Sequence, residues 1–232
     1  MPSSHRAARG QMSDSLLTAS FIILSGGLQD AYTYLCRGKV FANAQTGNIV
    51  LLSAYLFEGD TARAVRYLVP VLSFALGVFV AECIHRRFKR MEKIHWRQLI
   101  ILSEIVLLFA VGFLPQTINT FANAVVSFVC AMQVESFRKI EGNAYATTMC
   151  IGNLRSGMEY LYRWHVTRDR AHLHRAKVYY LVILVFVLGA ALGGVTCRSL
   201  GRLSILICCP LLLSAVAVMA WTKRSAEHGK KK

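Results

Sequence analysis

The sequence predicts an all-α membrane protein with about six transmembrane helices and two interrupted, re-entrant segments. Of its 232 residues, 55% are hydrophobic and 17% are charged, whereas average soluble domains contain about 25% charged residues. The deficit comes from long uncharged stretches, which are separated by short loops rich in Lys and Arg. A helix that crosses a bilayer needs about 20 mostly apolar residues. The segments that qualify are 16–36, 67–85, 98–114, 118–137, 178–197 and 203–222.

The net charge of +15 would indicate nucleic-acid binding in a soluble protein. Here the basic residues lie between apolar runs, so they indicate membrane topology and contacts with anionic lipid headgroups, and no nucleic-acid partner is expected. The first apolar run is too long for the core of a secretory signal and is interpreted as the first transmembrane helix. The expected organisation is a cytoplasmic tail over 1–15, one integral membrane domain over 16–222 and a basic cytoplasmic tail over 223–232.

The basic loops predict the orientation, because Lys and Arg are retained on the cytoplasmic side. The loops 86–97 and 163–177 and the C-terminal tail are all strongly basic. If every apolar segment crossed, the two loops would fall on opposite sides. If 41–57 and 144–162 enter the membrane without crossing it, both loops and both termini are cytoplasmic. This six-span arrangement is favoured, with seven or eight spans as the alternatives.

The chain resembles itself after a shift of 105 residues. Gly47-Asn48 falls on Gly152-Asn153, and Tyr55-Leu56 falls on Tyr160-Leu161. The repeat halves are about 16–114 and 118–222. Three spans in each half would insert the second half upside down, an arrangement that recurs in secondary transporters with sites at the midplane. With eight spans the repeats would instead be parallel.

The two interrupted segments carry Gly, Asn and Thr at membrane depth. Irregular backbone survives there only when it is buried in protein or lines a watery cavity. A half-helix that starts at such a point aims its positive dipole end at the midplane, where it suits an anionic or polar group. The alternative is that these residues only cap and turn the chain. The candidate solute- or ion-binding residues here are Asn43, Gln45, Thr46, Gly47, Asn48, Thr147, Thr148, Gly152 and Asn153.

Acidic residues inside the apolar runs are further candidates, because a charge at the helix centre costs about 2.5–3.5 kcal/mol on the insertion scale. Asp30 could pair with Arg37, cap the re-entrant segment or bind a proton or cation. No basic residue lies within a turn of Glu104, although Asn119 and Asn123 could satisfy it. The full set of candidates with their neighbouring amides is Gln29, Asp30, Glu104, Gln133 and Glu135. For Glu82 and Glu135 we favour simple pairing with nearby Arg86 or Arg138.

Small residues recur every four positions in two of the predicted spans. Ser73, Gly77 and Ala81 form one stripe, and Gly189 and Gly193 form the other. Such spacing lets helices approach closely in lipid. We expect the two stripes to meet each other, with a homodimer interface as the alternative.

A family resemblance lies in the stretch GGLQDAYTYLCRGKVFANAQTGNIVLLSAYLFEGD and, in the second half, AYATTMCIGNLRSG. Both resemble motifs of the YoaK-like family of small multi-span bacterial membrane proteins, and the likeness covers roughly residues 15–222. It implies a protein of the bacterial inner (plasma) membrane with no established substrate or catalytic residue. The second half reads Cys-Ile-Gly-Asn where Thr-Gly-Asn is expected, so equal roles for the two segments do not follow.

The favoured function is a transporter or channel for a small polar or ionic solute. The alternative is a non-transporting scaffold, sensor or partner subunit. No G-x-S-x-G or H-E-x-x-H motif occurs, so we expect neither an enzyme nor a catalytic site, cofactor or metal site. The cysteines, most of them inside apolar runs without a C-x-x-C spacing, are interpreted as packing residues.

Overall fold

The computed structural model describes residues 15–88, 96–140, 143–145 and 147–228. The cytoplasmic tail predicted over 1–15 lies outside these ranges except for Ser15. Within them the chain is helical almost throughout, which agrees with the predicted all-α class. The helices are α1 (Leu16–Cys36), α2 (Gln45–Phe57), α3 (Thr61–Phe88), α4 (Trp96–Phe113), α5 (Asn119–Ser136), α6 (Cys150–Thr167), α7 (Arg170–Leu200) and α8 (Cys208–His228), with 3-10 turns at Gln116–Ile118 and Gly201–Ile207.

Each predicted span overlaps one of these helices, and α1 has the bounds that the hydropathy indicates. Ser15 begins α1 by accepting a hydrogen bond from the backbone N–H of Thr18, as an N-cap does. The sequence did not predict a two-stranded antiparallel ladder between β1 (Lys139–Ile140) and β2 (Asn143–Ala144), in which Lys139 pairs with Ala144.

The basic stretch 163–177 was predicted to be a loop, and this was wrong. Helix α6 continues through Thr167, and α7 starts at Arg170, eight residues before the apolar run. The Asp169 side chain caps α7 by accepting from the N–H of Ala171. Hydropathy marks where a helix meets lipid, whereas Arg, Ala, Leu and Lys are good helix formers on either side of that boundary.

Four helical stretches of the described chain are long and apolar enough to cross a membrane. They are 61–88, 96–113, 116–136 and 170–221. The last one runs from α7 into α8, and its 52 residues exceed the roughly 20 that one crossing needs. Helix α1 is not among the four, because polar residues such as Gln29 and Asp30 lower its mean hydropathy.

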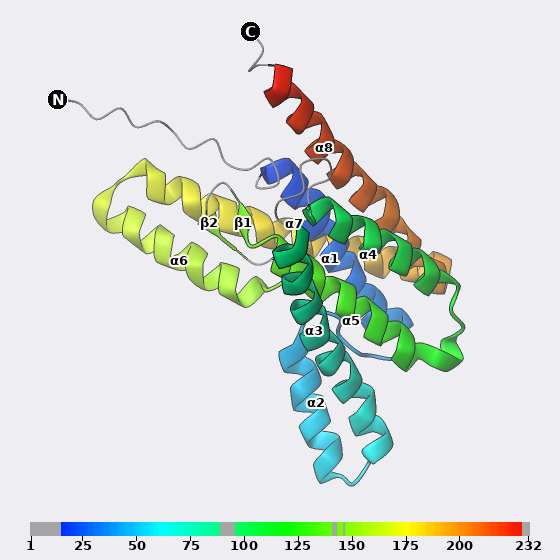
Figure 1. Ribbon diagram of the computed structural model, residues 1–232. Helices are drawn as coiled ribbons and strands as arrows, with labels where there is room; N and C mark the ends of the chain where they lie inside the picture. Colours follow the sequence, from blue (N-terminus) through cyan, green and yellow to red (C-terminus); the bar gives the residue numbers. More distant parts are fainter. Residues whose placement is uncertain (1–14, 89–95, 141–142, 146, 229–232) are drawn as a thin grey trace, which may run out of the picture.

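The helices pack as two hairpins around a central group (Figure 1). Helix α2 runs back along the first half of α3, where Tyr55 stacks on Tyr67 with ring centroids 5.6 Å apart. Helix α6 runs back along the first half of α7, where Gly157 lies against Tyr179 and Tyr180. Helix α5 packs against α3, α1 packs against α7, and α4 and α8 complete the group.

The small-residue stripes face these partners and not each other, so the expectation that they meet is wrong. A Cβ on Gly77 of α3 would lie 2.3 Å from the carbonyl oxygen of Phe128 on α5. A Cβ on Gly189 of α7 would lie 2.1 Å from the carbonyl oxygen of Leu24 on α1. Each stripe therefore lets α3 or α7 touch the backbone of its own neighbour, as small residues do in membrane helices.

Candidate functional site

A network of buried polar side chains connects α1, α4 and α5 at the middle of the central group. We call it the polar centre and define it as Ser25, Gln29, Asp30, Asn43, Glu104, Cys130 and Gln133, all of them buried. Most of the surrounding core is apolar. Buried polar groups are usually hydrogen-bonded, and each member of the polar centre makes at least one such contact.

Glu104 lies halfway along α4 with 0% of its surface exposed. The Gln29 amide nitrogen donates to Glu104 Oε1 at 2.8 Å and to the Ser25 hydroxyl at 3.0 Å. With its amide nitrogen turned toward the acid, Gln133 donates to both carboxyl oxygens, at 2.8 and 3.2 Å. One carboxyl group on α4 therefore ties α1 to α5.

Cys130 extends this network toward the second acid. Its thiol donates to the Gln29 amide oxygen at 2.8 Å and lies 3.3 Å from the side-chain nitrogen of Asn43. The backbone N–H of Asn43 donates to Asp30 Oδ1 at 2.8 Å. A continuous chain of contacts thus runs from Glu104 through Gln29, Cys130 and Asn43 to Asp30.

Asp30 faces the start of α2. It is 9% exposed, and its carboxyl accepts from the chain just before the helix begins at Gln45. The positive end of the α2 dipole therefore faces an acid, which is a favourable arrangement. Of the alternatives for Asp30, the structure shows contact with the segment that precedes α2 and not with Arg37.

Arg37 is fully buried and holds the end of α4. Its guanidinium donates to the carbonyl oxygens of Val111 at 2.8 Å and Leu114 at 3.0 Å. It also donates to the Asn119 side chain at 3.1 Å and to the Tyr32 hydroxyl at 2.6 Å. The cation therefore neutralises the negative end of α4 and is not available to the polar centre.

Asn119 and Asn123 do not satisfy Glu104, contrary to one expectation. Asn119 accepts from Arg37, and the Asn123 amide donates to the Arg37 carbonyl oxygen at 2.9 Å. Both asparagines lie near the start of α5, whereas Gln133 near its end reaches Glu104.

Asn48 braces the turn that precedes α2. Its amide nitrogen donates to the Phe41 carbonyl oxygen at 2.7 Å and to Gln45 Oε1 at 2.9 Å, and its amide oxygen accepts from the Phe41 N–H. Gly47 lies under the Phe41 ring, which a Cβ would approach to 3.1 Å. These contacts have the geometry of capping and turning the chain. Thr46 is exposed and does not join the polar centre.

The second interrupted segment brings Thr147, Thr148 and Asn153 into the interior, where all three are buried. The Thr148 methyl group lies against α1, since a Cβ on Gly26 would be 2.6 Å from it. The same Cβ would lie 3.5 Å from the Gln133 side-chain amide group, so this threonine borders the polar centre. Gly152 is exposed and faces open space.

Glu135 lies outside the polar centre, in an ion pair with Arg138, as the sequence predicted. Arg138 also lies 3.6 Å from Glu82, so one cation serves both acids. Sequence reasoning missed Ser25 and Cys130. The only signal was their spacing: Ser25 lies four residues before Gln29, and Cys130 lies three residues before Gln133. Residues at that spacing share a helix face.

The apolar helices and their enclosed polar centre define a multi-pass helical membrane protein. Residues 18–219 match the family described as protein of unknown function (DUF1275), and the chain belongs to this family. Comparisons with curated proteins and with solved structures found no match.

Proposed function

We propose that this protein transports a small polar or ionic solute across the membrane through the polar centre. The observation that carries the proposal is Glu104, a fully buried acid in the middle of an apolar helix, held by amides from α1 and α5. Acids within transmembrane segments are costly and commonly mark a pathway for ions or substrates. Asp30 supplies a second acid at the other end of the same network.

The two short helices support this proposal because both begin deep in the protein. Helix α2 runs antiparallel to α3, so the Tyr55–Tyr67 contact puts the start of α2 at about the level of Gly77 on α3. In the same way, the Gly157–Tyr179 contact puts the start of α6 at about the level of Phe186 on α7. Those levels lie in the middle of the apolar stretches of α3 and α7. Broken helices of this kind form the binding sites of many transporters.

Unpaired polar atoms at the same place favour a solute that donates hydrogen bonds. Among the described residues, the side-chain oxygens of Asn43, Thr147 and Thr148 are buried without a hydrogen-bond partner. Buried polar atoms are rarely left unpaired. An ammonium group, a hydroxyl group or a bound cation would satisfy such oxygens.

We further propose six spans, with both termini in the cytoplasm, and an inverted repeat. The neighbouring helices support the repeat, in which α1 corresponds to α5, α2 to α6 and α3 to α7. Helix α1 packs on α7 as α5 packs on α3, and α2 packs on α3 as α6 packs on α7.

We also propose that the protein comes from a bacterium, lies in its inner membrane and belongs to the YoaK-like subfamily. The chain is also proposed to have no enzymatic activity, to need no cofactor and to form a homodimer.

The test is a flux and stabilisation assay on the purified protein. The full chain is reconstituted in liposomes, and a panel of inorganic cations, amines, amino acids and sugars is screened for uptake and for thermal stabilisation. Flux of one solute class that Glu104→Gln and Asp30→Asn reduce at least tenfold would support the proposal. Glu58→Gln is the matched control, because Glu58 is an exposed acid at the end of α2.

Two results would reject the transport proposal. One is the absence of both flux and stabilisation across the panel with folded protein, which would favour the scaffold, sensor or subunit function. The other is a flux that the polar-centre variants and the Glu58 control change equally, which would place the pathway elsewhere.

A further inference from the structure

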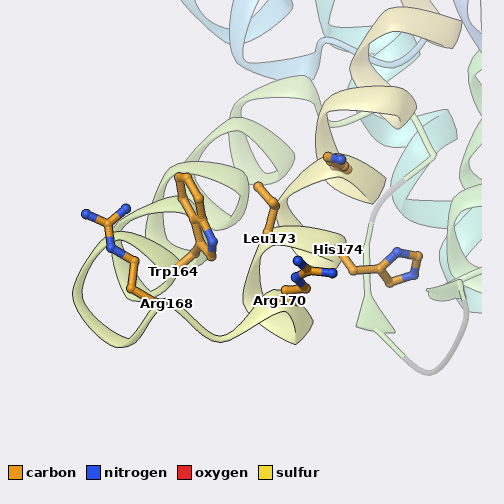
Figure 2. Close-up of a pocket in the computed structure, with 6 residues that line it drawn as sticks. Trp164, Arg168, Arg170, Leu173 and His174 are labelled. Atoms are coloured by element: carbon orange, nitrogen blue, oxygen red, sulfur yellow. The ribbon is translucent and has the colours of Figure 1, made fainter.

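The turn between α6 and α7 contains a hollow of about 510 Å³ on the surface. We call it the turn pocket, and its lining residues are Trp164, Arg168, Arg170, Leu173, His174 and Lys177. Figure 2 shows Trp164 on the last turn of α6 facing Leu173 on α7, with Arg168 beyond Trp164 and with Arg170 and His174 on the α7 side. The lining thus combines an aromatic ring, an aliphatic side chain and a set of cations.

The basic side chains lie together because of helix periodicity. Arg170, His174 and Lys177 are spaced by four and three residues, which places them on one face of α7. Arg168 follows Trp164 by four residues, and its guanidinium lies 5.6 Å from the Trp164 ring centroid. Two cationic edges, one from each helix, therefore border the same hollow.

Acids close to the turn are engaged elsewhere. Asp169 accepts from the Ala171 N–H as the cap of α7, and Glu159 pairs with Arg163 at 2.6 Å. Neither acid lines the turn pocket. In the described part of the chain, Arg170 and Lys177 have no acidic partner.

The basic side chains on this face favour an anion. Asp169 already caps the positive end of α7, and the first turn then carries Arg170, with Lys177 two turns further along the same face. Like charges close together on one helix face repel, so a bound anion would relieve the repulsion between these side chains.

The turn pocket lies at the level of the lipid headgroups if α7 crosses the membrane. At 1.5 Å per residue, the 31 residues of α7 extend about 46 Å, against a hydrocarbon core of about 30 Å. The uncharged stretch 178–197 accounts for the core, so residues 170–177 lie at the membrane surface. Tryptophan is enriched at this boundary.

We propose that the turn pocket binds the phosphate group of an anionic lipid headgroup. Arg168, Arg170 and Lys177 hold the phosphate oxygens, since Arg and Lys are the side chains that bind phosphate best. Trp164 and Leu173 contact the glycerol and the first acyl carbons. The site is separate from the polar centre, and the proposal holds whether or not the protein transports a solute.

The test measures thermal stabilisation of the purified full chain in detergent. Three additions are titrated: short-chain phosphatidylglycerol, short-chain phosphatidylcholine and inorganic phosphate. The pocket variant is Arg170→Gln with Lys177→Gln. The matched control is Arg163→Gln with Arg175→Gln, which removes the same charge from the same hairpin, at residues that do not line the pocket. Arg168→Gln repeats the test with a single change if the double variant is unstable without lipid.

Selective stabilisation by phosphatidylglycerol is expected. The pocket variant should bind it at least tenfold more weakly, since a direct hydrogen bond to a charged group contributes about tenfold or more, and the control should lose clearly less. Equal losses in both variants would indicate diffuse attraction and overturn the proposal. Phosphatidylcholine as effective as phosphatidylglycerol, or no effect of either lipid, would overturn it as well. Inorganic phosphate as effective as phosphatidylglycerol would assign the pocket to a soluble phosphate compound instead of a lipid.

Discussion

Gln29 on α1 donates a hydrogen bond of 2.8 Å to the carboxyl group of Glu104 on α4, across 75 residues of sequence. Gln133 on α5 donates to both oxygens of the same carboxyl group. Two amides from opposite halves of the chain thus converge on one acid. In an apolar interior these bonds matter to all three partners, because each one that is lost leaves buried polar groups less fully compensated.

Gln29→Leu should therefore destabilise the protein by about 1–3 kcal/mol, the cost of leaving a buried polar group unpaired. Leucine preserves most of the side-chain volume, so the loss reflects the missing donor. The measurement is thermal or denaturant unfolding in detergent. The triple variant Gln29→Leu, Glu104→Leu, Gln133→Leu should recover much of the loss, because it removes the acid together with both of its amide partners, and removing all partners of a buried bond is nearly neutral. A triple variant less stable than Gln29→Leu would contradict the importance of these bonds.

Gly189→Ala should destabilise the protein by about 1–3 kcal/mol, as overpacking of a tight interior does. The new Cβ would lie 2.1 Å from the Leu24 carbonyl oxygen, so α1 and α7 must separate. Gly194→Ala is the control on the same helix, since its Cβ would meet only the Leu35 side chain at 3.7 Å. Melting temperatures of the two variants in detergent make the comparison. Equal melting temperatures would mean that α1 and α7 do not touch at Gly189.

The sequence predicted the helices and the acids of the polar centre well, for one physical reason. Polar groups are costly in lipid, so Gln29, Asp30, Glu104 and Gln133 stood out against apolar surroundings. Their mutual contacts could not be predicted, because these depend on how α1, α4 and α5 pack. Cys130 shows this limit, since a thiol in an apolar run is typical of a packing residue, yet it lies between Gln29 and Asn43.

Helix ends and helix neighbours were predicted less well. Hydropathy placed the start of the fifth span at 178, whereas α7 begins at Arg170, because its basic residues form helix outside lipid as readily as apolar ones do inside it. The glycine stripes indicated close contacts correctly but not their partners. A stripe of small residues indicates that another helix packs closely, but it does not indicate which helix. Only the packed structure shows that Gly77 contacts α5 and that Gly189 contacts α1.

Arg37→Lys should lower stability by about 2 kcal/mol or more, even though the charge is kept. The planar guanidinium donates to several acceptors at once, including the last carbonyl groups of α4. An ammonium group cannot reproduce this planar arrangement of N–H donors. The exposed neighbour Lys39 provides a control, and Lys39→Gln should leave the unfolding temperature unchanged. If Arg37→Lys unfolds at the wild-type temperature, the contacts with Val111 and Leu114 contribute little.

Asn48→Ala distinguishes a structural brace from a solute ligand. Because the Asn48 amide makes three hydrogen bonds around Phe41 and Gln45, alanine should cost about 1–2 kcal/mol of stability in the absence of any solute, as the loss of a capping side chain does. Gly47→Ala should add a smaller loss, because its Cβ would press on the Phe41 ring. Gly152→Ala at the matching position should be neutral, since nothing lies within 4 Å of its Cβ. Unfolding curves without solute test all three variants. A stable Asn48→Ala variant that lost only solute-dependent stabilisation would show instead that Asn48 binds the solute directly.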